Sequence, residues 1–161
     1  GKIDLNGSFY FISDGKTAGI TIIDNKKTHT EISSELIIGE NSIFPDIILE
    51  CRIVNCDNLR KIKNVHKNLT FYYLDYDKIH GRIFVRSRES GDKISLRSRG
   101  CTKSLKKLFN ELSIPPEKRN CIAVFADDCG VILVEGAGID SRVAVTKETK
   151  KVLVIRLFKE Y

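Results

Sequence analysis

The sequence predicts an α+β fold in which a β-rich first part precedes a mixed α+β domain. Short apolar runs separated by turn signals recur along most of the chain, a pattern typical of strands. One stretch, residues 105–112, instead places its apolar residues at helical spacing. The chain has 161 residues, of which 42% are hydrophobic, enough to build a packed core in one domain or two small ones.

The first part is expected to be a series of short strands. They cover residues 8–13, 18–23, 35–38 and 47–54, with turns at residues 14–15 and 24–25. Around Leu49 and Cys51 apolar and polar residues alternate, which fits a sheet with one buried face. Charged residues and asparagine accumulate at residues 57–68, where the apolar periodicity fades. We therefore expect one segment at residues 1–70 and a second domain at residues 71–161.

The second part begins with two expected strands and a basic loop. The strands cover residues 69–74 and 81–85, and the loop covers residues 86–100. Gly91 and Gly100 lie in this loop, where glycine favours a positive φ or a close approach to a ligand. Further on we expect a hairpin of residues 121–126 and 131–135, a tight turn at 136–138, a strand or loop to residue 145 and an apolar run at 152–158.

The strongest helix signal lies between the basic loop and the hairpin. Four apolar residues at i, i+3, i+4 and i+7 form one stripe: Leu105, Leu108, Phe109 and Leu112. Thr102 or Ser104 is the expected N-cap, and the Ile-Pro-Pro run at residues 114–116 ends the helix. Away from the stripe this helix is expected to present Lys103, Lys106, Lys107 and Asn110. A short helical turn at residues 116–119 adds two more cations nearby.

The basic residues of the chain are concentrated in one segment. The formal net charge is +6, and residues 82–119 alone contain eleven basic and four acidic residues. This segment therefore accounts for the whole positive surplus. Such a concentration favours an anionic partner, but an ordinary solvated basic face is the alternative, and charge alone does not decide between them.

Arginine and lysine in this segment are the candidate binding residues. Arginine binds a phosphate through two parallel hydrogen bonds, whereas lysine supplies a compact charge. Exposed aromatic residues are few, and Tyr72, Tyr73 and Tyr76 are interpreted as strand residues. We therefore expect recognition of a folded RNA through its backbone and shape. The candidate set is Arg86, Arg88, Lys93, Arg97, Arg99, Lys103, Lys106, Lys107, Lys118 and Arg119.

No catalytic, cofactor or metal site is expected. The chain has no glycine-rich phosphate cradle, and Asp127 and Asp128 fall in a predicted turn, where aspartate is favoured for its own backbone bonds. Five cysteines without a CxxC pair are expected to be reduced and mostly buried, and three scattered histidines make a metal site improbable. No apolar run is long enough to span a membrane and no signal peptide is expected, so the expected location is the cytoplasm.

Several linked motifs carry a resemblance to a known family. They are residues 73–79 (YLDYDKI), 85–94 (VRSRESGDKI), 103–109 (KSLKKLF), 114–119 (IPPEKR), 131–136 (VILVEG), 139–142 (IDSR) and 145–150 (VTKETK). In this order they resemble the C-terminal domain of the bacterial tRNA(Ile)-lysidine synthases. The likeness covers residues 71–157, whereas residues 1–70 match only loosely and are placed by position at the end of the preceding region. One departure is Leu133, where many members have tryptophan.

The resemblance implies a full-length ligase that uses ATP to adenylate the wobble cytidine of tRNA(Ile) with a CAU anticodon and then joins lysine to it. In that family an N-terminal PP-loop domain, with ATP and magnesium, carries the chemistry, and the motif Ser-Gly-Gly of that loop does not occur in this chain. The fragment is therefore expected to be inactive alone, with tRNA(Ile) and the catalytic domain of the same polypeptide as partners. The family's last domain is also similar to a tRNA-binding module of the phenylalanyl-tRNA synthetase β-subunit, which suggests an α+β fold.

Two other functions stay open. The chain is alternatively a protein-interaction or dimerisation module, present as a homodimer, with a merely solvated basic face. A stand-alone enzyme is the second alternative, and it is disfavoured because no nucleotide or nucleophile motif occurs in the sequence.

Overall fold

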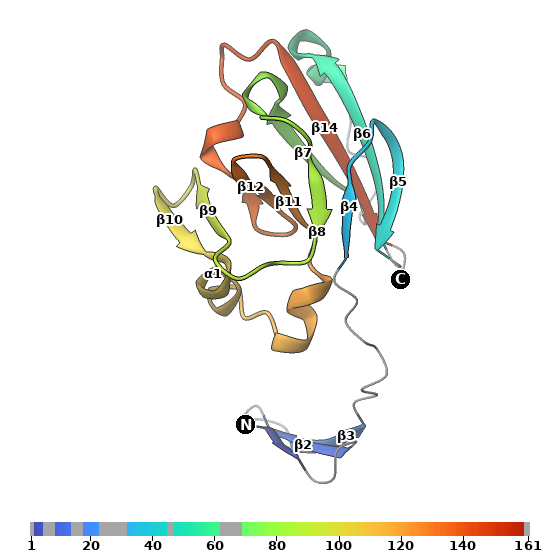
Figure 1. The fold of residues 1–161 in the computed structure, drawn as a ribbon, viewed down its shortest axis with the longest axis vertical. Coiled ribbons are helices and arrows are strands. Elements are labelled where there is room, and N and C mark those ends of the chain that lie inside the picture. The colour runs from blue at the N-terminus through green and yellow to red at the C-terminus, as the bar shows by residue number, and fades with distance from the viewer. Residues whose placement is uncertain are drawn as a thin grey trace. The chain divides into compact units, whose positions relative to one another are not determined.

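The computed structural model describes residues 2–4, 9–13, 18–22, 32–44, 47–61 and 69–159 (Figure 1). The chain divides into two compact units, Gly1–Thr30 and Glu31–Tyr161. The first unit contains an antiparallel sheet in the order β1-β2-β3. Its strands are β1 (Lys2–Asp4), β2 (Phe9–Ser13) and β3 (Ala18–Ile22). The turns expected at residues 14–15 and 24–25 lie outside the described residues.

The second unit is mostly β-sheet. Its strands are β4 (Ser33–Glu35), β5 (Gly39–Phe44), β6 (Ile47–Asn55), β7 (Leu69–Asp75), β8 (Phe84–Arg86), β9 (Lys93–Leu96), β10 (Cys101–Ser104), β11 (Val124–Asp127), β12 (Gly130–Val134), β13 (Gly138–Ile139) and β14 (Lys151–Lys159). Between these strands, the part of the unit that the structure describes contains one α-helix, α1 (Leu105–Glu111), and the 3-10 segments η1 (Cys56–Lys61), η2 (Tyr76–Lys78), η3 (Pro116–Cys121) and η4 (Ser141–Val143). The expected α+β class thus reduces to a mainly β fold with few helices.

The described residues of this unit form three sheets. One has five strands in the order β13-β12-β11-β8-β4, one has four in the order β5-β6-β14-β7, and β9 and β10 form a two-stranded ribbon. Strand β14 lies at the centre of the four-stranded sheet, where it pairs antiparallel with β6 and β7 over nearly its whole length. The apolar run expected at residues 152–158 is therefore a central, buried strand.

Two hydrophobic cores lie on either side of the five-stranded sheet. Phe125 of β11 packs into the first core with Leu49, Leu74 and Ile155 from the four-stranded sheet. Its neighbour Val124 belongs to the second core, which lies between this sheet, β9 and α1. Because side chains alternate along a strand, one strand contributes to both cores. The five-stranded sheet is thus a middle layer, with the four-stranded sheet on one face and α1 on the other (Figure 1).

The chain divides into compact units at a different residue from the expected boundary. We expected segments at residues 1–70 and 71–161, whereas the compact units divide after Thr30. The physical reason is strand pairing: β4 pairs with β8, and β6 pairs with β14, so the five-stranded and the four-stranded sheet both take strands from either side of residue 70. Of the boundary stretch expected at residues 57–68, residues 62–68 lie outside the described residues.

Several local expectations are also corrected. The segment expected as a basic loop, residues 86–100, contains β9, which forms a hairpin with β10. The strand expected at residues 81–85 is shorter and lies at β8, and residues 36–38 connect two strands instead of forming one. Gly91 and Gly100 do have positive φ, at 88° and 61°, as expected of glycines in turns.

The expectation that the cysteines are mostly buried is wrong. All five are free thiols, but only Cys51 is buried, Cys56 is half-buried, and Cys101, Cys121 and Cys129 are exposed. Burial raises the pKa of the Cys51 thiol to about 12, with a smaller contribution from the charge of Glu50. Among the described residues, no helix is both long and apolar enough to cross a membrane.

Candidate anion-binding surface

Helix α1 is fixed by its cap and its apolar stripe. The Ser104 hydroxyl accepts a hydrogen bond from the Lys107 N–H at 3.3 Å, which confirms Ser104 as the N-cap. Leu105, Leu108 and Phe109 are almost fully buried in the second core, as the stripe predicts. Leu112, the fourth residue of that stripe, is the C-cap and is 37% exposed, because the helix ends before it.

The helix carries its cations on the side away from the core. Lys106 and Lys107 are exposed, and neither forms an ion pair with a residue that the structure describes. Lys103, expected on the same helix, lies instead on β10, where it is the register partner of Ile94. Because β10 runs directly into α1, this lysine still lies close to the first turn of the helix.

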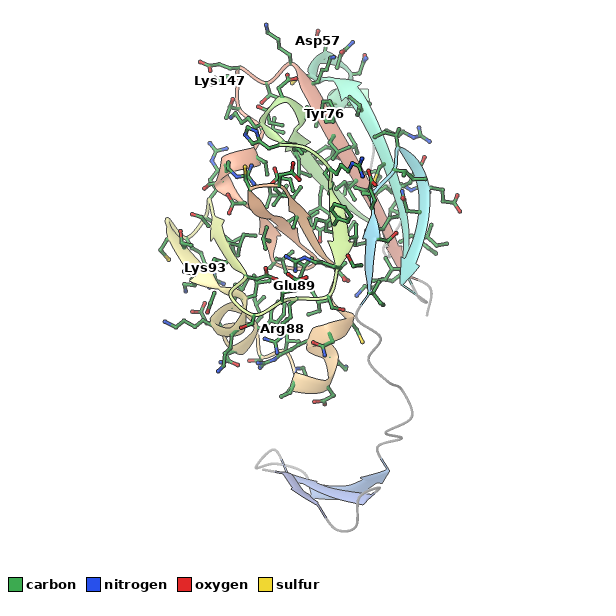
Figure 2. The ribbon with its side chains drawn as sticks, in the orientation of Figure 1. Asp57, Tyr76, Arg88, Glu89, Lys93 and Lys147 are labelled. Atoms are coloured by element: carbon green, nitrogen blue, oxygen red, sulfur yellow. The ribbon has the colours of Figure 1, made fainter. Side chains whose placement is uncertain are left out.

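Two adjoining hollows collect five of the ten candidate residues. The first, of about 570 Å³, is lined by Lys93, Cys101, Thr102, Lys103, Ser104, Lys107 and Glu111. The second, of about 400 Å³, is lined by Arg88, Glu89, Ser90, Gly91, Asp92, Ser104, Lys106 and Asn120. Because Ser104 lines both, the two hollows form one continuous surface, which we call the basic surface. Figure 2 shows Arg88 and Lys93 in the lower half of the second unit, and Asp57 and Lys147 at its top.

Arg86 does not belong to the basic surface. Its side chain is only 13% exposed and donates two hydrogen bonds to the Asp92 carboxylate, at 2.7 and 2.9 Å. Asp92 also accepts the N–H of Glu89, and its carbonyl accepts the N–H of Leu105, the first residue of α1. The pair therefore positions the turn of residues 87–91 against the start of the helix.

The charges within this pair shift both pKa values. Burial by itself raises the pKa of Asp92, but hydrogen bonds from Arg86 and the Glu89 N–H, with the charge of Arg86, outweigh it and leave the pKa below its ordinary value. The hydrogen bond to Asp92 raises the pKa of Arg86 further, against the effect of its own burial. Both groups are therefore ionised at neutral pH.

Glu111 holds two more of the candidate cations. One of its oxygens accepts a hydrogen bond from Lys103 Nζ at 2.6 Å, and the other accepts one from Arg99 Nη1. The hydrogen bond from Lys103 makes the largest contribution to lowering the pKa of Glu111, and Arg99 adds to it. Part of the positive charge at the first hollow is thus already neutralised by an internal carboxylate.

Arg88 lines the second hollow, whereas Arg97, Lys118 and Arg119 lie outside both hollows. Arg88 is half-buried, with its guanidinium carbon 6.0 Å from the centre of the Phe109 ring. Arg119 donates to the Ile114 carbonyl and to the Asn110 side chain, at 2.9 and 2.7 Å, and both acceptors are neutral. Arg97 is exposed and donates to the Val145 carbonyl at 3.3 Å, which directs it toward a different part of the chain. Lys118 is exposed on η3.

The sequence did not point to three polar residues of the basic surface as ligand contacts. The sequence predicts Thr102 and Ser104 only as helix caps and predicts no role for Asn120, although all three line the hollows. Asn120 is brought there by a hydrogen bond from the Ser87 hydroxyl to its carbonyl, at 2.7 Å. This contact joins segments that are distant in the chain, so no local pattern signals it.

Away from the basic surface, Asp127 and Gly136 have the structural roles in turns that the sequence predicts. Asp127 accepts the N–H of Cys129 at 2.9 Å, as a turn aspartate does, and its buried carboxylate is also paired with Arg142. Gly136 has a φ of 74° in a tight turn. Across the described ranges, no three His, Cys, Asp or Glu side chains come close enough together to hold a metal ion.

Fold and surface together define a β-rich domain with a cation-lined face, a class of domain suited to an anionic partner. Residues 83–157 match the family model described as the TilS substrate C-terminal domain. The chain is 37% identical over 103 residues to the tRNA(Ile)-lysidine synthase of Caldanaerobacter subterraneus, a match covering 64% of this chain and 22% of that protein. Residues 83–157 are therefore similar to the TilS C-terminal domain, and the chain is similar over much of its length to the tRNA(Ile)-lysidine synthases.

Two further comparisons cover more of the chain. The tRNA(Ile)-lysidine synthase of Clostridium perfringens is 29% identical over 161 residues, which cover 96% of this chain and 34% of that protein. The chain thus spans between about a fifth and a third of the curated relatives it matches. A crystal structure of a TilS C-terminal domain superposes with a TM-score of 0.64 at 18% identity, covering 81% of this chain and 98% of that one, so the fold is shared.

Proposed function

We propose that this chain binds tRNA as the C-terminal part of a tRNA(Ile)-lysidine synthase. One observation carries the proposal: Arg88, Lys93, Lys106 and Lys107 line two adjoining hollows, and none of these four is paired with a carboxylate among the described residues. Such cations neutralise phosphates and release the counterions that surround them. The names of the curated relatives identify tRNA(Ile) as the RNA.

The surface is suited to the RNA backbone more than to unpaired bases. Base stacking needs an exposed aromatic ring, and the aromatic residue nearest the cations, Phe109, is fully buried. Tyr76 and Phe84 are partly exposed but do not line either hollow. We therefore propose contacts to phosphates of a folded tRNA, which place the tRNA for a catalytic site elsewhere in the polypeptide.

The chemistry belongs in this proposal to the part of the enzyme that precedes this chain. There an N-terminal PP-loop domain would use ATP and magnesium to activate the wobble cytidine before lysine is joined to it, and this chain alone would be inactive. The same proposal places the enzyme in the cytoplasm. We also propose that the domain is similar to the tRNA-binding module of the phenylalanyl-tRNA synthetase β-subunit, with which a mainly β fold is compatible.

The test compares two triple variants with equal loss of charge. Lys93→Ala, Lys106→Ala and Lys107→Ala together remove three of the five cations of the basic surface. Changing three exposed lysines elsewhere to alanine, Lys147, Lys150 and Lys151, serves as the control. Binding of transcribed tRNA(Ile) is measured between about 50 and 200 mM salt, where phosphate contacts dominate the affinity. The first variant should flatten the log–log salt dependence by about three, one for each lost contact. Its affinity should fall by roughly tenfold or more.

Three outcomes distinguish the alternatives. Weakened binding in the first variant alone supports the proposal. Equal losses in both variants mean that only net charge matters, and unchanged affinity in both means that this surface does not meet the tRNA. Sedimentation of the wild-type chain with and without tRNA(Ile) separates tRNA binding from a dimerisation module, since only the latter predicts self-association independent of RNA.

A further inference from the structure

We propose that Glu111 determines the specificity of the basic surface by excluding phosphates from part of the first hollow. The inference rests on the proposed tRNA binding. Glu111 lines this hollow together with Lys93, Lys103 and Lys107, and it is the one acidic residue in that lining. It lies at the last position of α1, on the exposed side of the helix.

The geometry gives this carboxylate two bound cations. Its oxygens each accept a hydrogen bond from a different residue, Lys103 on β10 and Arg99 on the turn before that strand. Two oxygens held between an ammonium and a guanidinium reproduce the way in which a phosphate would bind the same pair. Glu111 therefore occupies a place that a phosphate of any polyanion would otherwise take.

A carboxylate in this position affects ligands unequally. A phosphate that approaches Lys103 meets a like charge and must displace Glu111 from both cations. Among the described residues, no carboxylate pairs with Lys93, Lys107, Arg88 or Lys106. The two carboxylates that line the second hollow, Glu89 and Asp92, pair with Arg86 instead. A tRNA whose phosphates match these four positions binds without disturbing Glu111, whereas an ill-matched polyanion loses the additional contacts. Repulsion of wrong partners is a common source of specificity.

The lysine and arginine held by Glu111 remain partly accessible, so their release has consequences. The side chains of Lys103 and Arg99 are 26% and 36% exposed, and that of Glu111 is 40% exposed. Replacing Glu111 with glutamine removes the charge without removing volume. Two cations then become available to any nearby phosphate, and a loosely bound polyanion gains most because it shifts to use them.

The experiment measures how well the chain discriminates between two RNAs. Glu111→Gln is compared with wild type for binding of transcribed tRNA(Ile) and of a random-sequence RNA duplex, over a range of salt concentrations. We expect duplex binding to strengthen about three- to tenfold at low salt, with a salt dependence steeper by about one to two. Binding of tRNA(Ile) should change less, so that the ratio of the two affinities falls.

Two further variants control for charge and for the freed lysine. Glu117→Gln adds the same charge on η3, where the residue is exposed and lies outside both hollows. The double variant Lys103→Gln/Glu111→Gln restores the net charge and removes one released cation, so it should return the duplex affinity toward wild type. Circular dichroism and thermal unfolding establish that each variant is folded.

The results separate the two proposals. A reduced ratio in Glu111→Gln alone, reversed in the double variant, supports the inference. If Glu111→Gln behaves like Glu117→Gln, only bulk charge is involved, and if it weakens tRNA binding, Glu111 instead holds the cations in place for the RNA; either result overturns the inference and leaves tRNA binding intact. A wild-type chain that binds tRNA(Ile) no better than the duplex overturns the proposed function, and the inference with it.

Discussion

Arg86 and Lys106 lie in the same basic segment, but the structure gives them different roles. The turn that follows β8 buries Arg86 against Asp92, and the hydrogen bonds of that pair connect the turn to the start of α1. The outer side of α1 leaves Lys106 exposed, with no carboxylate partner among the described residues. Both residues carry one positive charge, but only Lys106 is accessible to a ligand in the folded chain.

This difference shows that counting basic residues in the sequence overestimates how many of them are available to bind a ligand. Arg86 acts inside the fold, whereas Lys103 and Arg99 share one internal carboxylate. Burial makes the Arg86 and Asp92 pair important for stability, because removing one partner leaves an uncompensated charge. Exposure makes Lys106 nearly irrelevant to stability and available to a ligand. Variants in each region should therefore separate stability from tRNA binding.

The largest effect is expected where the two regions share a core residue. Phe109 is fully buried under α1, and Arg88 from the turn lies over its ring. Phe109→Ala should lower the free energy of unfolding by about 3–5 kcal/mol, since it removes a large buried side chain and leaves a cavity. Urea denaturation measures this change. Leu112→Ala on the same helix, 37% exposed, is the control and should lower it by only about 1 kcal/mol or less. Equal losses would show that the helix does not pack as described.

The next effect tests the turn itself. Asp92→Asn removes the charge that faces Arg86 and should reduce stability at pH 7 by about 2–3 kcal/mol, below the value for a fully buried pair because both side chains are slightly exposed. Asp128→Asn, in an exposed turn, is the control. Binding of tRNA(Ile) by folded Asp92→Asn should weaken through misplacement of Arg88, with the salt dependence little changed. If Asp92→Asn is as stable as wild type, the Arg86–Asp92 pair does not hold the turn in place.

The same variant has a pH signature. The pKa of Asp92 lies below its ordinary value in the folded chain, so this carboxylate stabilises the fold above its unfolded pKa of about 4. That contribution is lost as pH falls through the lower, folded pKa. Wild type should therefore lose stability in this acid range more steeply than Asp92→Asn, as measured by urea denaturation at a series of pH values. Parallel curves would contradict the sign of the shift.

Local chemistry predicted the helix well and the surroundings poorly. The stripe of Leu105, Leu108 and Phe109 and the Ser104 cap were evident because neighbours in a helix are neighbours in sequence. The pairing of β4 with β8 joins distant segments, and no local pattern indicates which strands will pair. The division of the chain after Thr30 could not be predicted for this reason.

The sequence predicts that the candidate site consists of basic residues, but it does not predict which of them pair with carboxylates. All ten residues were chosen by charge, and five of them do line the basic surface. Charge alone does not reveal that Asp92 pairs with Arg86 or that Glu111 bridges two cations, because those partners are selected by the hairpin of β9 and β10 and by the end of α1. Acidic residues within a basic segment therefore require the same attention as the basic ones.

The smallest expected effect concerns Arg88, which belongs to both regions. It lies on the turn that the buried pair positions, and its guanidinium is 6.0 Å from the Phe109 ring centre, at the outer limit of a cation–π contact. Arg88→Ala should lower the free energy of unfolding by only about 0.5 kcal/mol, as such contacts do at partly exposed sites. It should nevertheless reduce the salt dependence of tRNA(Ile) binding by about one, whereas Arg88→Lys keeps the charge and should restore that dependence. A loss of stability as large as that of Asp92→Asn would make Arg88 part of the fold, because its burial would then matter more than its charge.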